Sequence, residues 1–196
     1  MVGWTDEFQN LPCLWNRAVR LAATAAQAHP GLGPQTGFVR GLIHPFTGWD
    51  HWVAMLAIAF WAAQRGSRLL LPAAFVGAMA LGAVAGHHFG PIPGIEQGIA
   101  LSVLVTGLLI ARSVSLPAPA GVALVGVFAV FHGAAHGAEM PASAGSLAFG
   151  GGFLAATAFL LFAGAALAAR CPPRGSQVAG WTVAAAGLAL AIGIGR

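Results

Sequence analysis

Histidines and carboxylates gather in two short motifs of this sequence. In chain order, the members of these motifs are His44, Asp50, His51, His132, His136 and Glu139. The last three follow an i, i+4, i+7 spacing, which places their side chains within about 60° on one face of a helix. Imidazole and carboxylate groups without thiolates suit borderline divalent metals such as nickel, cobalt or zinc. The two motifs therefore predict a site for a divalent transition-metal ion.

The composition of the chain is typical of a membrane protein. Hydrophobic residues make up 58% of the 196 positions and charged residues only 7%, with a mean hydropathy of +0.79. Six apolar stretches cover approximately residues 48–64, 69–86, 95–111, 118–138, 146–169 and 178–194. At about 1.5 Å per residue, a helix of 17 residues spans roughly 25 Å, enough for a thin bilayer. We expect an all-α membrane protein, a bundle of six transmembrane helices without a soluble domain.

The arginines that give the net charge of +4 indicate how the bundle is oriented in the membrane. They do not indicate a nucleic-acid partner. Five of the nine arginines lie in alternate loops between the apolar stretches: Arg65, Arg68, Arg112, Arg170 and Arg174. Positively charged loops of membrane proteins face the cytoplasm. All six members of the two motifs then fall on the opposite side, which is the periplasmic side of a bacterial inner membrane.

The first 28 residues resemble a leader peptide. Arg17 and Arg20 precede an alanine-rich run that ends in an Ala-x-Ala pattern, so cleavage is expected after Ala28. Residues 29–196 would then form a single six-helix transmembrane domain. Cleavage would make His29 the first residue, and its free amine and imidazole could chelate a metal. Without cleavage, His29 is an ordinary loop histidine.

Several of these polar residues also have purely structural interpretations. Thr47 and Asp50 have the spacing of a capping box, which would begin a helix without any ligand role. Glu96 stands near the start of the third stretch, and His87 and His88 stand near the end of the second. All three match the preference of the helix dipole for acids at N-termini and cations at C-termini. For the two adjacent histidines we favour the dipole interpretation, and we keep Glu96 as a possible additional ligand.

The motifs resemble those of a known family. His44-Pro45-x-x-Gly48-x-Asp50-His51-x-x-Ala54-Met55 and Phe131-His132-Gly133-x-Ala135-His136-Gly137-x-Glu139-x-Pro141 are similar to two motifs of the HupE/UreJ family of nickel/cobalt permeases. The segment from Pro93 to Ser102 resembles the start of the family's third span, and His29-Pro30-Gly31 resembles its mature N-terminus. Two positions depart from the pattern. Ala59 replaces an expected glycine, and the fifth span, around Thr157, lacks a histidine that many members carry.

The resemblance implies a small secondary permease that imports Ni²⁺ or Co²⁺ across the bacterial inner membrane and supports hydrogenase or urease assembly. The two motifs would then form its periplasm-facing metal site, with His29 and Glu96 as possible further ligands. The expected partners are the transported ion and membrane lipid. No nucleic acid or resident cofactor is expected, and no nucleotide is expected either, because the chain has no phosphate-binding glycine-rich lysine motif.

Two other classes of protein remain as alternatives. An intramembrane zinc hydrolase could use three histidines and a carboxylate around an open coordination position to activate water. A haem protein would place paired histidines facing each other inside the core, whereas these histidines are predicted near one rim of the bundle. A metal permease, not an enzyme, is the function that we expect.

Overall fold

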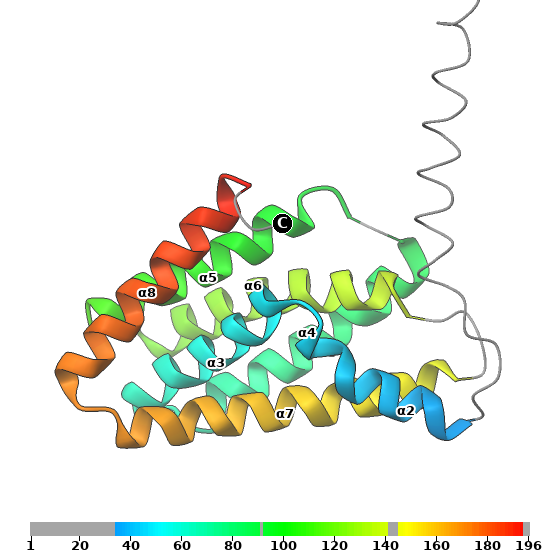
Figure 1. Cartoon of the computed structure of the whole chain (residues 1–196), viewed down its shortest axis with the longest axis horizontal. Helices are drawn as coiled ribbons and strands as arrows, with labels where there is room; N and C mark the ends of the chain where they lie inside the picture. Colours follow the sequence, from blue (N-terminus) through cyan, green and yellow to red (C-terminus); the bar gives the residue numbers. More distant parts are fainter. Residues whose placement is uncertain (1–33, 91, 141–144, 194–196) are drawn as a thin grey trace, which may run out of the picture. The chain divides into compact units, whose positions relative to one another are not determined.

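The computed structural model describes residues 34–90, 92–140 and 145–193, and these residues form helices joined by short connections (Figure 1). The helices are α2 (Pro34–Ile43), the 3-10 helix η1 (His44–Phe46), α3 (Trp49–Gln64), α4 (Leu70–Phe89), α5 (Ile95–Ala111), α6 (Ala118–Ala138), α7 (Ser146–Arg170) and α8 (Pro173–Ala191). The predicted leader, with its cleavage point, and His29 lie outside the described residues.

The all-helical class is confirmed, and six helices, α3 to α8, coincide with the six apolar stretches of the sequence. The helices α4, α6 and α7 are long and apolar enough to cross a membrane, while α5 is a shorter apolar helix. That all six helices cross the membrane stays a prediction. The largest difference is at α8, which begins at Pro173 and not at residue 178. Proline is favoured at the first position of a helix, and the polar residues that follow extend α8 beyond its apolar part.

The helix α2 was not predicted. It has only ten residues, too few to stand out as an apolar stretch, and it packs along the first half of α7 (Figure 1). The two backbones approach so closely that a Cβ on Gly41 would collide with the carbonyl of Phe149, and one on Gly152 with the carbonyl of Phe38. This contact holds the chain that leads into η1 against α7.

In two further helix pairs, glycines let the two backbones touch. We call these contacts the α4–α6 seam and the α5–α8 seam. In the α4–α6 seam, a Cβ on Gly133 would collide with the Met79 carbonyl, and one on Gly137 with the Ala83 carbonyl. The small-xxx-small spacing of these glycines therefore allows the two helices to approach closely. In the α5–α8 seam, Gly107, Gly180 and Gly187 meet the facing backbone in the same way.

Large apolar side chains fill the middle of the bundle. Ile58, Trp61 and Phe75 are at most 1% exposed and belong to one cluster contributed mainly by α3, α4 and α7. The indole N–H of Trp61 donates a hydrogen bond to the Val114 carbonyl at 3.0 Å, which fixes the end of α3 to the connection after α5. The core lies between the candidate ligands at one end of α3 and Arg65 at the other.

Candidate metal site

The first motif folds as a short 3-10 turn followed by the start of α3. Gly48 is the N-cap of α3, and no side chain caps this helix. The hydroxyl of Thr47 instead donates a hydrogen bond to the carbonyl of His44, at 2.7 Å. The capping-box interpretation is therefore wrong, because Thr47 lies one residue before the N-cap and its side chain turns backward. Asp50 is free of a capping role.

The second motif occupies the last two turns of α6. His132 is fully buried and His136 is 4% exposed, while Glu139 follows the helix as its C-cap and is exposed. The Nδ1–H of His132 donates to the Phe128 carbonyl at 2.9 Å. A histidine that donates from Nδ1 carries its free electron pair on Nε2, the form in which imidazole binds a metal. His132 is thus held in a ligating tautomer.

The two motifs meet in space and form a histidine cluster, His44, His51, His132 and His136. The ring centroids of His51 and His136 are 4.5 Å apart, those of His44 and His136 4.9 Å, and those of His51 and His132 5.5 Å. With a metal–nitrogen bond of about 2.1 Å, two rings that share an ion have centroids no more than about 6.4 Å apart. Each of these pairs is close enough to share one ion.

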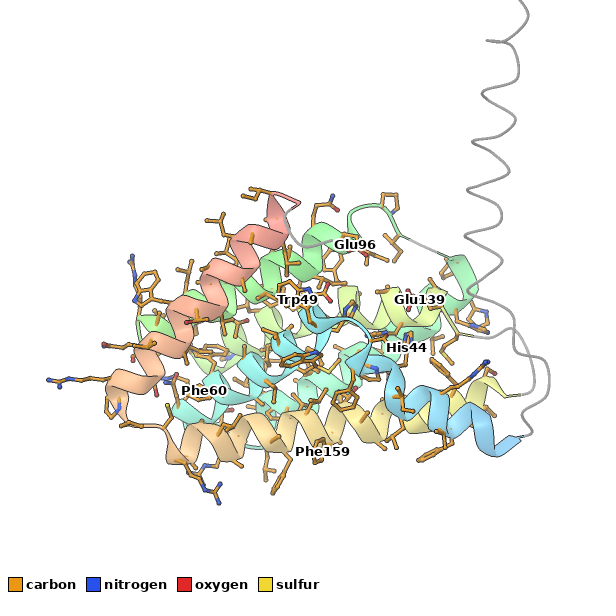
Figure 2. The ribbon with its side chains drawn as sticks, viewed as in Figure 1. His44, Trp49, Phe60, Glu96, Glu139 and Phe159 are labelled. Atoms are coloured by element: carbon orange, nitrogen blue, oxygen red, sulfur yellow. The ribbon has the colours of Figure 1, made fainter. Side chains whose placement is uncertain are left out.

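Glu139 brings a carboxylate to the histidine cluster. Its Oε2 lies 2.8 Å from Nε2 of His44, and the two side chains face each other between η1 and the end of α6 (Figure 2). Donor atoms of His44, His136 and Glu139 all lie within 4.8 Å of one another. The contact with His44 lowers the pKa of the Glu139 carboxyl below its usual value, although partial burial opposes this shift. A negative charge therefore stands beside two imidazoles.

Asp50 contacts the histidine cluster through His51. The imidazole Nδ1 and the backbone N–H of His51 both donate to Oδ1 of Asp50, at 2.8 and 3.0 Å. A carboxylate on one ring nitrogen orients the imidazole and makes the other nitrogen a better metal ligand. This geometry favours Asp50 as the residue that positions His51, whereas the motif alone predicts Asp50 as a direct ligand.

Apart from Nε2 of His44, which contacts Glu139, three nitrogens of the histidine cluster are buried without a hydrogen-bond partner in the described part of the chain. They are Nε2 of His132 and both ring nitrogens of His136. Leaving a buried polar group unsatisfied costs about 1–3 kcal/mol. Such a cost is reasonable where the group binds a ligand, and the rings that carry these nitrogens contact neighbouring imidazoles. The donor set and its burial fit a transition-metal ion.

An aromatic wall around the histidine cluster was not predicted. The ring centroid of Phe153 lies 4.4 Å from that of His136, Phe149 lies 5.2 Å from His44, and Phe75 lies 6.0 Å from His132. The i, i+4 spacing of the two α7 phenylalanines could have indicated a shared helix face, but nothing local shows which histidines they meet. These rings exclude water from one side of the imidazoles.

The remaining candidates stand apart from the histidine cluster. Glu96, in the first turn of α5, lines a pocket of about 280 Å³ together with Gln97 and Glu139, so the structure brings it near one candidate ligand. We name this cavity the α5–α6 pocket. His87 and His88 lie exposed at the end of α4.

Apolar helices that enclose a cluster of imidazoles define a helical membrane protein with a candidate metal site. Residues 17–190 match the family model described as HupE / UreJ protein. The chain is also 42% identical over 174 residues to "Protein HupE" of Rhizobium leguminosarum bv. viciae, which covers 86% of this chain and 91% of that protein. This protein belongs to the HupE/UreJ family. No solved structure matches it.

The family confirms the resemblance in the motifs and decides between the classes of function. Members of the HupE/UreJ family are transporters and accessory proteins, and they are not enzymes. The expectation that this protein is not an enzyme is therefore confirmed, and the hydrolase alternative has no support.

Proposed function

We propose that this protein is a secondary permease that imports Ni²⁺ or Co²⁺ across the bacterial inner membrane and supplies hydrogenase or urease assembly. The observation that carries the proposal is the meeting of four imidazoles from η1, α3 and α6, with buried nitrogens that lack other partners. The transported ion is the substrate of this site.

The distribution of charge supports a site that faces the periplasm. Arg65 and Arg112 follow α3 and α5 directly, and Arg170 ends α7. The candidate ligands that the structure describes lie near the other ends of α3 and α5 or at the carboxyl end of α6. With six antiparallel spans, α3 to α8, arginine-rich loops would face the cytoplasm and the histidine cluster the periplasm.

The chemistry of the site suits capture of a hydrated dication. Glu139 is 63% exposed, so its charge can attract the cation from water before the buried imidazoles replace water ligands. Imidazole nitrogen binds nickel and cobalt in preference to calcium and magnesium, which prefer oxygen. Selectivity would therefore come from His44, His51, His132 and His136.

The packing below the histidine cluster supports transport by rearrangement of the helices. Phe75 contacts the deepest histidine, His132, and Ile58 and Trp61 fill the core farther along α3. An ion could pass these side chains only after helices move relative to one another. The tight α4–α6 and α5–α8 seams would move as units. The driving force would be the metal gradient or coupling to another ion, because no nucleotide-binding motif is present in the sequence.

Uptake of radioactive nickel and cobalt tests the proposal. Cells that express the wild type, His136→Ala and the control Ser102→Ala are compared at limiting metal, with uptake normalised to protein in the membrane. Loss of the central imidazole should reduce uptake by about 10- to 100-fold, the range found when metal-site partners are removed. Ser102→Ala should import like the wild type, because the Ser102 hydroxyl bonds only within α5 in the described contacts. Equal uptake by His136→Ala and the wild type would refute the proposal.

A further inference from the structure

Two further histidines lie outside the histidine cluster, at the end of α4, the helix that packs against α6. His87 and His88 are exposed near the carboxyl end of α4, and their ring centroids are 5.6 Å apart. Cations at this position are favoured by the helix dipole, which accounts for the residue type. The dipole does not account for the cavity that these histidines border.

This cavity, which we name the α4–α7 pocket, has a volume of about 260 Å³. His87 and His88 form part of its lining, with Ser146 and Phe153 of α7 among the residues on the other side. His136 of the histidine cluster also lines it. One pocket therefore joins two exposed imidazoles to the buried imidazole at the centre of the cluster.

At the inner end of this pocket, His136 is the side chain that is available to bind an ion. His136 is 4% exposed, and neither of its ring nitrogens has a hydrogen-bond partner in the described residues. Six water molecules occupy about 180 Å³ at about 30 Å³ each, so the pocket is large enough for a dication with its first hydration shell.

We propose that His87 and His88 form an outer metal-binding site that captures Ni²⁺ or Co²⁺ from water and passes it through the α4–α7 pocket to His136. This inference rests on the proposed function as a metal permease. It assigns a role to two residues that the histidine cluster does not include.

The geometry of His87 and His88 suits weak, reversible binding of an ion. A centroid separation of 5.6 Å is within the limit of about 6.4 Å for two imidazoles on one ion. Two protein ligands leave the other coordination positions to water, so the ion is held weakly and exchanges readily. The carboxyl end of α4 adds a partial negative charge that favours a cation.

The pocket walls favour onward movement of the ion. Most of the lining side chains are apolar, including Ala83, Val84, Leu147 and Leu154. Such walls supply no ligands, so the ion keeps its water until it reaches His136. Replacement of water by imidazole would then occur at the histidine cluster.

The α5–α6 pocket is the competing route. It reaches Glu139 from the other side of α6 and is lined by Glu96 and Gln97. A tryptophan in either pocket should obstruct that pocket alone, which makes Ser146→Trp and Gln97→Trp a matched pair. We expect slower uptake at limiting Ni²⁺ for Ser146→Trp than for Gln97→Trp. Wild-type uptake by Ser146→Trp would overturn it.

The histidine pair is tested directly by uptake kinetics with Ni²⁺ alone. The double variant His87→Ala/His88→Ala should raise the KM about tenfold, because a capture site concentrates the ion near the pocket. The maximal rate should stay within twofold of the wild type. Phe89→Ala is the control, since Phe89 is 85% exposed on the same helix end but does not line the pocket. A wild-type KM in the double variant would overturn the proposal.

Binding to the purified full-length chain in detergent separates capture from transport. In equilibrium dialysis with Co²⁺, the wild type should bind one more weakly held ion than the double variant, and both should keep the tighter site. Equal numbers of bound ions would contradict an outer site. Suppose that the wild type imports metal and His136→Ala does not. Wild-type uptake by His87→Ala/His88→Ala would then refute only the outer site and leave the proposed function intact. If the wild type imports no metal, the proposed function itself fails.

Discussion

The α4–α6 and α5–α8 seams bring helices together by the same means but differ in the polar groups that their helices bury. In both seams, glycines let one backbone touch the other. On α5, the buried hydroxyl of Ser102 donates to the Ile99 carbonyl at 2.7 Å. On α6, His132 and His136 together bury three nitrogens that have no partner among the described residues.

This difference separates packing from ligand chemistry. Glycines that permit close approach are common in membrane helices and say nothing about a ligand. A hydroxyl can satisfy itself on the preceding turn of its own helix, so its burial costs little. Neither ring nitrogen of His136 has such a partner in the described residues, so the burial of this imidazole on α6 requires another explanation. A metal ion would supply the missing partner.

The largest expected effect that tests this explanation is the loss of metal affinity when both imidazoles of α6 are removed. In the double variant His132→Ala/His136→Ala, Co²⁺ affinity of the purified protein should fall at least about 100-fold, because loss of one metal-site partner alone costs about 10- to 100-fold. Equilibrium dialysis at fixed ionic strength measures this change.

Mild acid should not remove the contribution of the Glu139 carboxylate to metal affinity. The contact with His44 lowers the pKa of Glu139, so this carboxyl is ionised above its lowered value and remains charged at pH 5.5. Its part of the affinity would be lost only in stronger acid. Wild-type Co²⁺ affinity in the double variant His132→Ala/His136→Ala would show that the imidazoles of α6 do not bind the ion, and the contrast between the two seams would then have no functional meaning.

The helices and the candidate ligands could be read from the sequence for different reasons. The helices α3 to α8 are visible because each carries a long apolar run, a requirement that acts within a single segment. Histidines and carboxylates stand out because such groups are rare and costly in apolar surroundings. His44 and His136 could therefore be named as candidates before their contact was known, although metal binding by them stays a prediction.

Other features depend on contacts between distant segments. The helix α2 is short, and glycine contacts with α7 hold it in place, so its ten residues give little local signal. The position of Phe149 against His44 depends on how η1 packs on α7, and that of Phe153 against His136 depends on how α6 faces α7. The contact between Asp50 and His51 is local, but whether Asp50 binds the metal or orients the imidazole depends on the direction of both side chains.

An intermediate effect is expected for Asp50→Asn, which tests this orienting role. The asparagine oxygen can still accept from Nδ1 of His51, but it lacks the charge that makes the imidazole a stronger ligand. Co²⁺ affinity should fall about tenfold, the lower end of the range for residues that orient metal ligands. The thermal midpoint of unfolding without metal should change little. A complete loss of binding in Asp50→Asn, with folding intact, would instead identify Asp50 as a direct ligand.

The smallest effect on affinity is expected from alanine in the two seams. A Cβ on Gly137 would collide with the Ala83 carbonyl, and one on Gly187 with the backbone N of Leu104. Each substitution should lower stability by about 1–3 kcal/mol, as overpacking does in well-packed interiors. Because Gly137 adjoins His136, Gly137→Ala should also weaken Co²⁺ binding a few-fold, whereas Gly187→Ala should leave it unchanged. Thermal unfolding and dialysis of both variants measure the two quantities. Equal weakening of binding would mean that the α5–α8 seam also supports the site, and the contrast between the seams would be lost.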